Sequence, residues 1–411
     1  PLLIGGATTS RVHTAVKIDP NYSKGQTVYV LDASRAVGVV SNLMSAEQRG
    51  PYVSDIRAEY KKVRENYLKG EQKKVRLPLK AARDNAFKTD WKAARPVKPS
   101  FFGPKVFDTY DLAELVPYID WTPFFQTWEL SGRFPRILDD NVVGPEARRL
   151  YADAQQLLAR IVEEKWFAAK AVIGFWPANA QGDDIVLFAD DERKKPLTIL
   201  HTLRQQMARE NQKEERANFA LSDFIAPLQS GVKDYIGGFA VTTGIGEDEA
   251  IEKHLPKTDD YNRIMAKALA DRLAEAFAER MHERVRRDFW GYARGERLTK
   301  EDLILEKYQG IRPAPGYPAQ PDHTEKGTLF KLLDAEAATG IKLTESFAMW
   351  PGSAVSGLYF AHPDSQYFGV GRIERDQVED YAKRKGWTIA ETERWLAPIL
   401  NYDPKSMKSA A

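Results

Sequence analysis

The 411-residue sequence contains no cysteine. Disulfide bonds, thiolate zinc sites and a cysteine nucleophile are therefore excluded. Histidine is scarce as well, and the six histidines include no close pair at metal-ligand spacing. They are His13, His201, His254, His282, His323 and His362. We expect no metal centre held by these residues alone.

The sequence also lacks a charge excess of either sign and a long apolar run. Lys and Arg number 60 against 58 Asp and Glu, which gives a formal net charge of +2 without a long block of one sign. Neither nucleic acid nor an anionic membrane is therefore an expected partner. No run approaches ~18 apolar residues and no charged-then-apolar leader is present, so we expect a cytoplasmic protein. With 43% hydrophobic residues, the chain can bury a sizeable core.

Residues 1–45 show a βαβα pattern. Strands are predicted at 2–4 and 27–31, and helices at 8–18 and 33–44. The pair Gly5-Gly6 follows the first strand, as in doubly wound sheets that present backbone to a nucleotide-like ligand. A turn that ends the strand explains the pair equally well. Two strands are too few to close a sheet, so we expect a partial Rossmann-like remnant that packs poorly without its missing half.

Residues 46–71 are predicted to form a helical linker. Apolar side chains recur every three or four residues along this charged segment, at Tyr52, Ile56, Tyr60, Val63 and Tyr67. A proline-dotted stretch from Arg76 to Pro104 follows. We therefore place a domain boundary near residue 72.

Residues 72–411 mix strands and helices without the regular alternation of a parallel sheet. Strands are predicted at 171–175, 184–188, 235–241 and 366–373, with a polar hairpin loop over 177–183. Helices are predicted at 144–165, 259–289, 328–339, 375–385 and 388–395. Clustered antiparallel strands with helices around them predict an α+β domain.

The helix predicted over 259–289 carries two distinct faces. Its apolar face is formed by Ile264, Ala268, Leu269, Leu273, Ala276, Phe277 and Met281. Arg272, Glu275 and Glu279 share a neighbouring face. On this pattern alone, they are either a surface ion-pair ladder or part of a binding site.

Two further segments suggest ligand binding. Asp120 is followed by Trp121, Phe124 and Phe125, and a carboxylate in such apolar surroundings is costly unless it is paired or caps a helix. The loop from Arg312 to Ala319 contains three prolines and one glycine, which hold its charged and aromatic side chains in fixed relative positions. A stiff surface connection is the alternative interpretation of this loop.

Several sequence blocks resemble, in the same order, the C-terminal part of cobalamin-dependent methionine synthase. Leu3-Ile4-Gly5-Gly6-Ala7-Thr8-Thr9-Ser10 and Asp32-Ala33-Ser34-Arg35 resemble the end of its cobalamin-binding domain. Blocks at 118–125, 267–276, 310–319, 323–326, 343–352 and 362–365 resemble its activation domain. The resemblance implies a domain division of 1–45, a linker over 46–71, and an S-adenosylmethionine-binding activation domain over 72–411.

The resemblance also implies roles for particular residues. Asp120 would bind the α-amino group of S-adenosylmethionine and Arg312 its α-carboxylate, which a planar guanidinium fork suits. Glu275, Tyr317, Tyr367 and Phe368 would complete the site for the sulfonium and adenine. Gly5, Gly6 and Ala33 would contact cobalamin as a partial site. His323 and His362 are expected to be loop residues that form hydrogen bonds, and His13 a structural residue.

The implied function is reactivation by reductive methylation of Co(II) cobalamin, with S-adenosylmethionine as methyl donor and a flavodoxin-like electron donor. The whole enzyme transfers a methyl group from methyltetrahydrofolate to homocysteine, and is thus a methyltransferase of methionine biosynthesis. The Asp-x-His-x-x-Gly loop with the cobalt-binding histidine is absent here, as are the homocysteine and folate regions. Two alternatives stay open: a non-catalytic module that binds S-adenosylmethionine or the electron donor, and a stand-alone S-adenosylmethionine-dependent methyltransferase.

Overall fold

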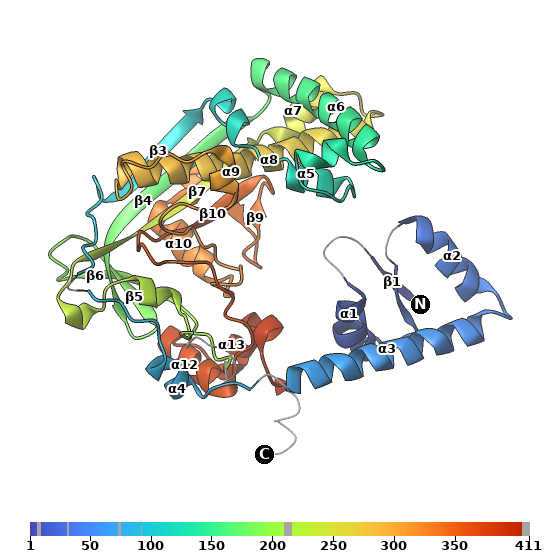
Figure 1. Cartoon of the computed structure of the whole chain (residues 1–411), viewed down its shortest axis with the longest axis horizontal. Coiled ribbons are helices and arrows are strands. Elements are labelled where there is room, and N and C mark those ends of the chain that lie inside the picture. The colour runs from blue at the N-terminus through green and yellow to red at the C-terminus, as the bar shows by residue number, and fades with distance from the viewer. Residues whose placement is uncertain (6–9, 31–32, 73–74, 92, 209–215, 405–411) are drawn as a thin grey trace. The chain divides into compact units, whose positions relative to one another are not determined.

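The computed structural model describes residues 1–5, 10–30, 33–72, 75–91, 93–208 and 216–404. The chain separates into two compact units (Figure 1). One contains Pro1–Arg76 with Met207 and Ala208, and the other contains Leu77–Gln206 with the described residues from 216 onward. No helix in the described ranges is long and apolar enough to cross a membrane.

The first unit is a small parallel β-sheet covered by helices. Strands β1 (Leu2–Ile4) and β2 (Thr27–Tyr29) pair in parallel, and the chain between them includes α1 (Arg11–His13) and a π-helical turn (Thr14–Ile18). Helices α2 (Ala33–Met44) and α3 (Arg49–Gln72) follow. The predicted apolar stripe of α3 packs into this unit, because Ile56 and Tyr60 are buried there and the Tyr60 hydroxyl accepts the Tyr29 N–H at 2.7 Å.

The second unit is built around a six-stranded antiparallel sheet, which confirms the predicted α+β class. Its strands are β3 (Gly103–Tyr110), β4 (Ala168–Gln181), β5 (Asp184–Phe188), β6 (Pro196–His201), β7 (Asp234–Ile245) and β10 (Ala354–Tyr359). The order is β10-β7-β4-β5-β6, with β3 also paired to β4. A separate hairpin joins β8 (Lys342–Leu343) and β9 (Met349–Trp350).

Helices cover both faces of this sheet. On one face, α5 (Thr122–Thr127), α6 (Gly144–Glu163) and α8 (Asp260–Arg284) form a core with Ile173, Phe239 and Val241. On the other, α10 (Glu325–Leu333) and α11 (Ala335–Thr339) pack against Val172 and Ala240. Figure 1 shows α8 and α10 on opposite sides of β7 and β10. The remaining helices are α4 (Leu79–Asp84), α7 (Glu247–His254), α9 (Lys300–Ile304), α12 (Arg375–Lys385) and α13 (Ile389–Trp395).

Helix α8 lies close to the sheet because small residues line its buried side. Ala266, Ala270, Ala274 and Ala278 are buried along with the larger apolar residues of the predicted face. The Thr243 hydroxyl of β7 donates to the Ala270 carbonyl at 2.8 Å. Ile264, which the sequence pattern placed on the apolar face, is 54% exposed, so that assignment was wrong.

Two other predicted elements differ from the structure. The predicted strand at 366–373 is irregular, because Gly371 has φ of +72° and the Val370 N–H donates to the Pro318 carbonyl of the proline loop. The predicted helix at 328–339 begins earlier, at Glu325, and is interrupted at Asp334, which adopts a left-handed conformation. The pattern also missed β3, β6 and β10.

The predicted hairpin is confirmed, because β4 and β5 pair antiparallel up to Gln181 and Asp184, but its loop is shorter than the predicted 177–183, since β4 continues through Pro177 to a tight turn at Gly182. Pro177 is tolerated because it lies between the two partners on that edge of β4. Pairing with β3 ends at Phe175, and pairing with β5 begins at Ala178. The missing N–H of Pro177 therefore costs no hydrogen bond to either strand.

Candidate functional site

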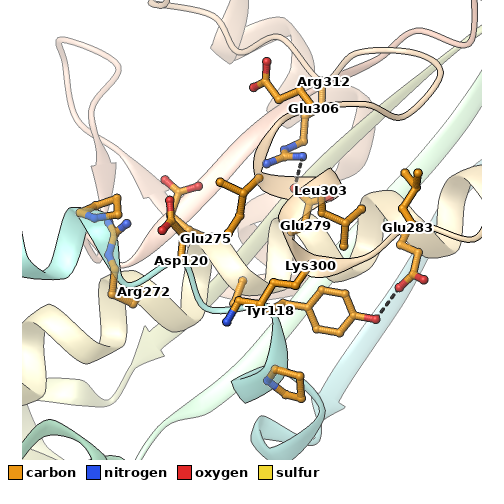
Figure 2. Close-up of a pocket in the computed structure, with 15 residues that line it drawn as sticks. Tyr118, Asp120, Arg272, Glu275, Glu279, Glu283, Lys300, Leu303, Glu306 and Arg312 are labelled. Carbon is orange, nitrogen blue, oxygen red and sulfur yellow. Dashed lines mark hydrogen bonds and ion pairs between the residues drawn. The ribbon is translucent and has the colours of Figure 1, made fainter. Parts of the chain in front are cut away.

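Two adjoining cavities lie in the second unit, and Glu275, Glu306 and Arg312 line both. The first has a volume of about 590 Å³ and is lined by α8, α9 and the segment before α5 (Figure 2). The second has a volume of about 500 Å³ and is lined by the proline loop, the start of β10 and the segment around Phe368. All six residues that the resemblance assigns to S-adenosylmethionine line one or both cavities: Asp120, Glu275, Arg312, Tyr317, Tyr367 and Phe368.

The first cavity carries more carboxylates than cations. Its charged side chains are Asp120, Glu275, Glu279, Glu283 and Glu306 against Arg272, Lys300 and Arg312. Glu279 forms an ion pair with Arg312 (2.7 Å), while Glu283 accepts hydrogen bonds from Tyr118 and Arg280. Figure 2 shows the Glu279–Arg312 and Tyr118–Glu283 contacts in the cavity wall. The carboxylates of Asp120, Glu275 and Glu306 have no ion-pair partner within 4 Å among the described residues, so the cavity favours a cationic ligand.

Arg312 is held in place from three sides. Its backbone N–H donates to the Tyr367 hydroxyl at 3.0 Å, and its Nη1 donates to Glu279 Oε2 at 2.7 Å. The same Nη1 lies 3.2 Å from the Tyr308 hydroxyl. Burial opposes ionisation of the guanidinium, but the Glu279 carboxylate outweighs it and keeps the pKa of Arg312 above its ordinary value. Arg312 is therefore a fixed cation whose Nη2 edge has no protein partner among the described residues.

A column of polar residues on α8 and on the π-helical turn that follows it (Val285–Phe289) supports this arginine. His282 lies one turn beyond Glu279, is fully buried and stacks on Tyr359 with ring centroids 5.3 Å apart. Burial, Arg286 and Arg312 lower the pKa of His282 well below 6.5, so the ring is neutral and its Nδ1 accepts from Arg312 at 3.4 Å. Arg286 is fully buried and donates to Glu296 in three contacts, two from Nε and one from Nη2, at 2.8–3.0 Å.

The second cavity has a largely apolar wall. Pro313, Pro315 and Pro318 line it with Tyr317, which is 64% exposed, and with Phe368. Gly316 has φ of +93° and packs directly against the His323 ring, so a side chain at this position would meet both backbone strain and a clash. The loop is therefore a stiff wall that presents the faces of its prolines and tyrosine.

Asp120 combines the two roles that its sequence context suggested. Its Oδ1 accepts the Thr122 N–H at 2.9 Å at the start of α5. The same carboxylate lines the first cavity and lies near Lys300, whose pKa is lowered by burial against the opposing effect of Asp120. Because Oδ1 of Asp120 makes the contact at the start of the helix, Oδ2 is available to a ligand.

The residues that the resemblance assigns to cobalamin lie in the first unit. A Cβ at Gly5 would lie 2.8 Å from the Val30 carbonyl oxygen, so the close approach of the two backbones already requires glycine there. Gly6 lies outside the described residues, and Ala33 is the first residue of α2. His13 is exposed and ends α1.

Of the two loop histidines, His362 is buried away from both cavities described above. Its Nε2 lies 2.9 Å from the Thr89 hydroxyl, and its Nδ1 accepts the Asp364 N–H at 3.1 Å. His323 is exposed and supports Gly316 in the proline loop. Both lie in loops, and the predicted side-chain hydrogen bonds are found for His362.

Sequence reasoning missed several residues of the cavity walls, notably Glu306, Lys300, Tyr308 and His282. The spacing of Glu275, Glu279, His282 and Arg286 by four, three and four residues would have placed a polar column on one face of the helix predicted over 259–289. Such a column on a helix that is otherwise buried indicates partners on another element. No comparable pattern marks Glu306, which reaches the site because its backbone turns with φ of +53° after α9.

The comparisons with known proteins agree with this geometry. Residues 111–386 match the family model described as vitamin B12 dependent methionine synthase, activation domain. A solved structure of the MetH reactivation domain bound to AdoHcy is 55% identical, covers 80% of this chain and 99% of its own, and superposes with a TM-score of 0.75. The matched range contains both cavities. The chain belongs to the family of vitamin B12-dependent methionine synthases, and its second unit contains their activation domain.

Proposed function

We propose that this chain is the reactivation module of a cobalamin-dependent methionine synthase and that it binds S-adenosylmethionine across the two cavities. The observation that carries the proposal is the convergence of Asp120, Glu275, Arg312, Tyr317, Tyr367 and Phe368 on two cavities with a common wall. The related structure at 55% identity holds AdoHcy, the demethylated product of the proposed ligand.

The charges of the cavities suggest how the ligand is oriented. The methionyl end carries an ammonium and a carboxylate, which match the Asp120 carboxylate and the fixed Arg312 guanidinium. The adenosyl end matches the apolar wall of the proline loop. The sulfonium then lies at the junction, where Glu275 and Glu306 line both cavities. Carboxylates at that junction attract a cation.

This arrangement binds and orients a methyl donor without a protein base. The S-methyl group of S-adenosylmethionine is already electrophilic, and cobalamin supplies the nucleophile when it is bound. Gly5 is accounted for by its close contact with Val30, and Ala33 is the first residue of α2, so neither residue by itself indicates a cobalamin contact. We infer that another segment of the enzyme presents the cobalamin, and that a flavodoxin-like protein supplies the electron.

A stand-alone S-adenosylmethionine-dependent methyltransferase is the less favoured alternative. Such enzymes place the ligand at a glycine-rich turn of a doubly wound parallel sheet. Both cavities here belong to the unit whose six-stranded sheet has only antiparallel pairs between its named strands. A non-catalytic binding module remains compatible with the same cavities and differs only in whether methyl transfer follows binding.

Calorimetric titration of the whole chain with S-adenosylmethionine tests the proposal. We expect one site per chain, and competition by AdoHcy. The Arg312→Lys substitution assigns the site, because it should weaken binding while circular dichroism shows an unchanged fold. Absence of binding by the folded wild-type chain would contradict the proposed function. To separate reactivation from binding alone, methylation of added cobalamin under reducing conditions would be measured.

A further inference from the structure

The Glu279 carboxylate lies between two arginines and binds only one of them closely. Its Oε2 accepts from Arg312 Nη1 at 2.7 Å (Figure 2), whereas its Oε1 lies 3.8 Å from Arg286 Nη1. A separation of 3.8 Å is too long for a hydrogen bond. Glu279 Oε1 and Arg286 Nη1 are both buried, and neither has a hydrogen-bond partner among the described residues. Glu279 therefore holds Arg312 and leaves one nitrogen of Arg286 unsatisfied.

A second carboxylate, that of Glu296, neutralises Arg286. It accepts from Nε and Nη2 of Arg286 in three contacts at 2.8–3.0 Å. In the described part of the chain, only Glu296 and Glu279 bring a carboxylate oxygen within 4 Å of this guanidinium. A fully buried arginine stays charged, and it is costly without a carboxylate partner. Because Glu296 supplies that partner, Glu279 remains available to Arg312.

Glu296 lies outside the ligand site, on the segment that follows the π-helical turn. This segment folds back on the turn, since the Ala293 N–H donates to the Arg286 carbonyl at 2.9 Å. Neither Glu296 nor Arg286 lines either of the two cavities. Charges of alternating sign thus lead from this segment to the site, in the order Glu296, Arg286, Glu279 and Arg312. A change at one end alters the partners available at the other.

We propose that Glu296 is a positioning residue for Arg312, and that it acts by keeping Arg286 from competing for Glu279. Without the charge of Glu296, the uncompensated Arg286 draws the Glu279 carboxylate toward itself, and Arg312 loses the partner that fixes its guanidinium. This inference rests on the proposed function, because it takes the α-carboxylate of the ligand as the group that Arg312 binds. It gives carboxylate recognition a determinant that touches no ligand.

The test compares two ligands that differ only in the carboxylate. AdoHcy and its decarboxylated analogue, S-adenosyl-3-thiopropylamine, are titrated into the whole chain by calorimetry. The ratio of the two affinities isolates the contact with Arg312, because the ammonium and the adenosyl group are common to both ligands. In Glu296→Gln, we expect this ratio to fall about three- to tenfold, while the analogue binds as it does to the wild-type chain. Asp288→Asn, which removes an exposed carboxylate of the π-helical turn outside both cavities, is the matched control and should leave the ratio unchanged.

A second variant separates competition for Glu279 from a loss of packing. When Arg286→Met is added to Glu296→Gln, no buried cation is left to draw Glu279 away, so the affinity ratio should return to its wild-type value. A ratio that stays low in this double variant would overturn the proposal, as would an unchanged ratio in Glu296→Gln or an equal loss of both ligands. Failure of AdoHcy to bind the wild-type chain would instead refute the proposed function.

Discussion

The two cavities achieve selectivity by different physical means. The first uses fixed charges: Arg312 is held by Glu279, and unpaired carboxylates line the wall around it. The second uses shape: a proline loop presents flat apolar faces. Charged hydrogen bonds are strong but depend on the position of each partner, whereas apolar contact tolerates small shifts. The first cavity should therefore be sensitive to single conservative substitutions, and the second should not.

The largest expected effect is that of Arg312→Lys. Lysine keeps the charge but loses the planar fork, so ligand binding should weaken by about 1.5–3 kcal/mol. Calorimetry with S-adenosylmethionine measures the change. Arg149→Lys, which alters an exposed ion pair with Glu146 outside both cavities, is the matched control and should bind normally. An unchanged dissociation constant for Arg312→Lys would reduce Arg312 to a structural loop residue.

Asp120→Asn should weaken binding by about 1–2 kcal/mol, because the ligand ammonium loses its charged partner. Asparagine retains the side-chain oxygen that accepts the Thr122 N–H, so the start of α5 is preserved. Thermal unfolding should therefore hardly change while the dissociation constant rises. A large drop in melting temperature with unaltered affinity would show that Asp120 serves the helix alone.

Tyr317→Leu should weaken binding by only about 0.5–1.5 kcal/mol, because leucine preserves apolar contact and removes the aromatic face. Tyr261→Leu, at an exposed tyrosine of α8 outside both cavities, is the control. If Tyr317→Leu weakened ligand binding more than Arg312→Lys does, the second cavity would be the more sensitive of the two. That result would contradict the contrast drawn between the two cavities.

The long regular elements were predicted well from the sequence, because the periodic spacing of their apolar residues is a local signal that does not depend on contacts with distant segments. Helix α12 occupies the predicted range 375–385, and α8 differs from its prediction mainly where the last turn becomes π-helical at Val285–Phe289. Strand β10 was missed, because its six residues include Gly357 and Ser356 and its stability comes from pairing with β7.

The candidate site was accessible to sequence reasoning only in part. Asp120, Glu275 and Arg312 were identified through resemblance, and their local patterns favoured a cap, an ion-pair ladder or a stiff loop. Contacts between distant segments decide what these residues do. The Arg312–Glu279 ion pair joins positions 33 residues apart, and the hydrogen bond between the Arg312 N–H and Tyr367 spans 55. Neither contact can be predicted from the spacing of residues within one helix or strand.

The smallest predicted effect concerns pH and the sulfonium. Partial burial raises the pKa of Glu306 above its ordinary value of 4.5, with Arg312 opposing and Glu279 adding to the shift. As pH falls through this raised pKa, Glu306 becomes neutral and its attraction for the sulfonium is lost. AdoHcy lacks the sulfonium charge but shares the ammonium and carboxylate, so those groups cancel in the affinity ratio of the two ligands.

We therefore expect the ratio of the affinities for S-adenosylmethionine and AdoHcy to decline as pH is lowered from 7 towards 4.5. The decline falls in this range because the raised pKa of Glu306 lies above 4.5. The change should be on the order of 0.5–1 kcal/mol, because solvent screens a partly exposed carboxylate. Calorimetry at a series of pH values measures the ratio, and Glu306→Gln should flatten its pH dependence. A pH dependence that persists in Glu306→Gln would assign the effect to another carboxylate of the first cavity.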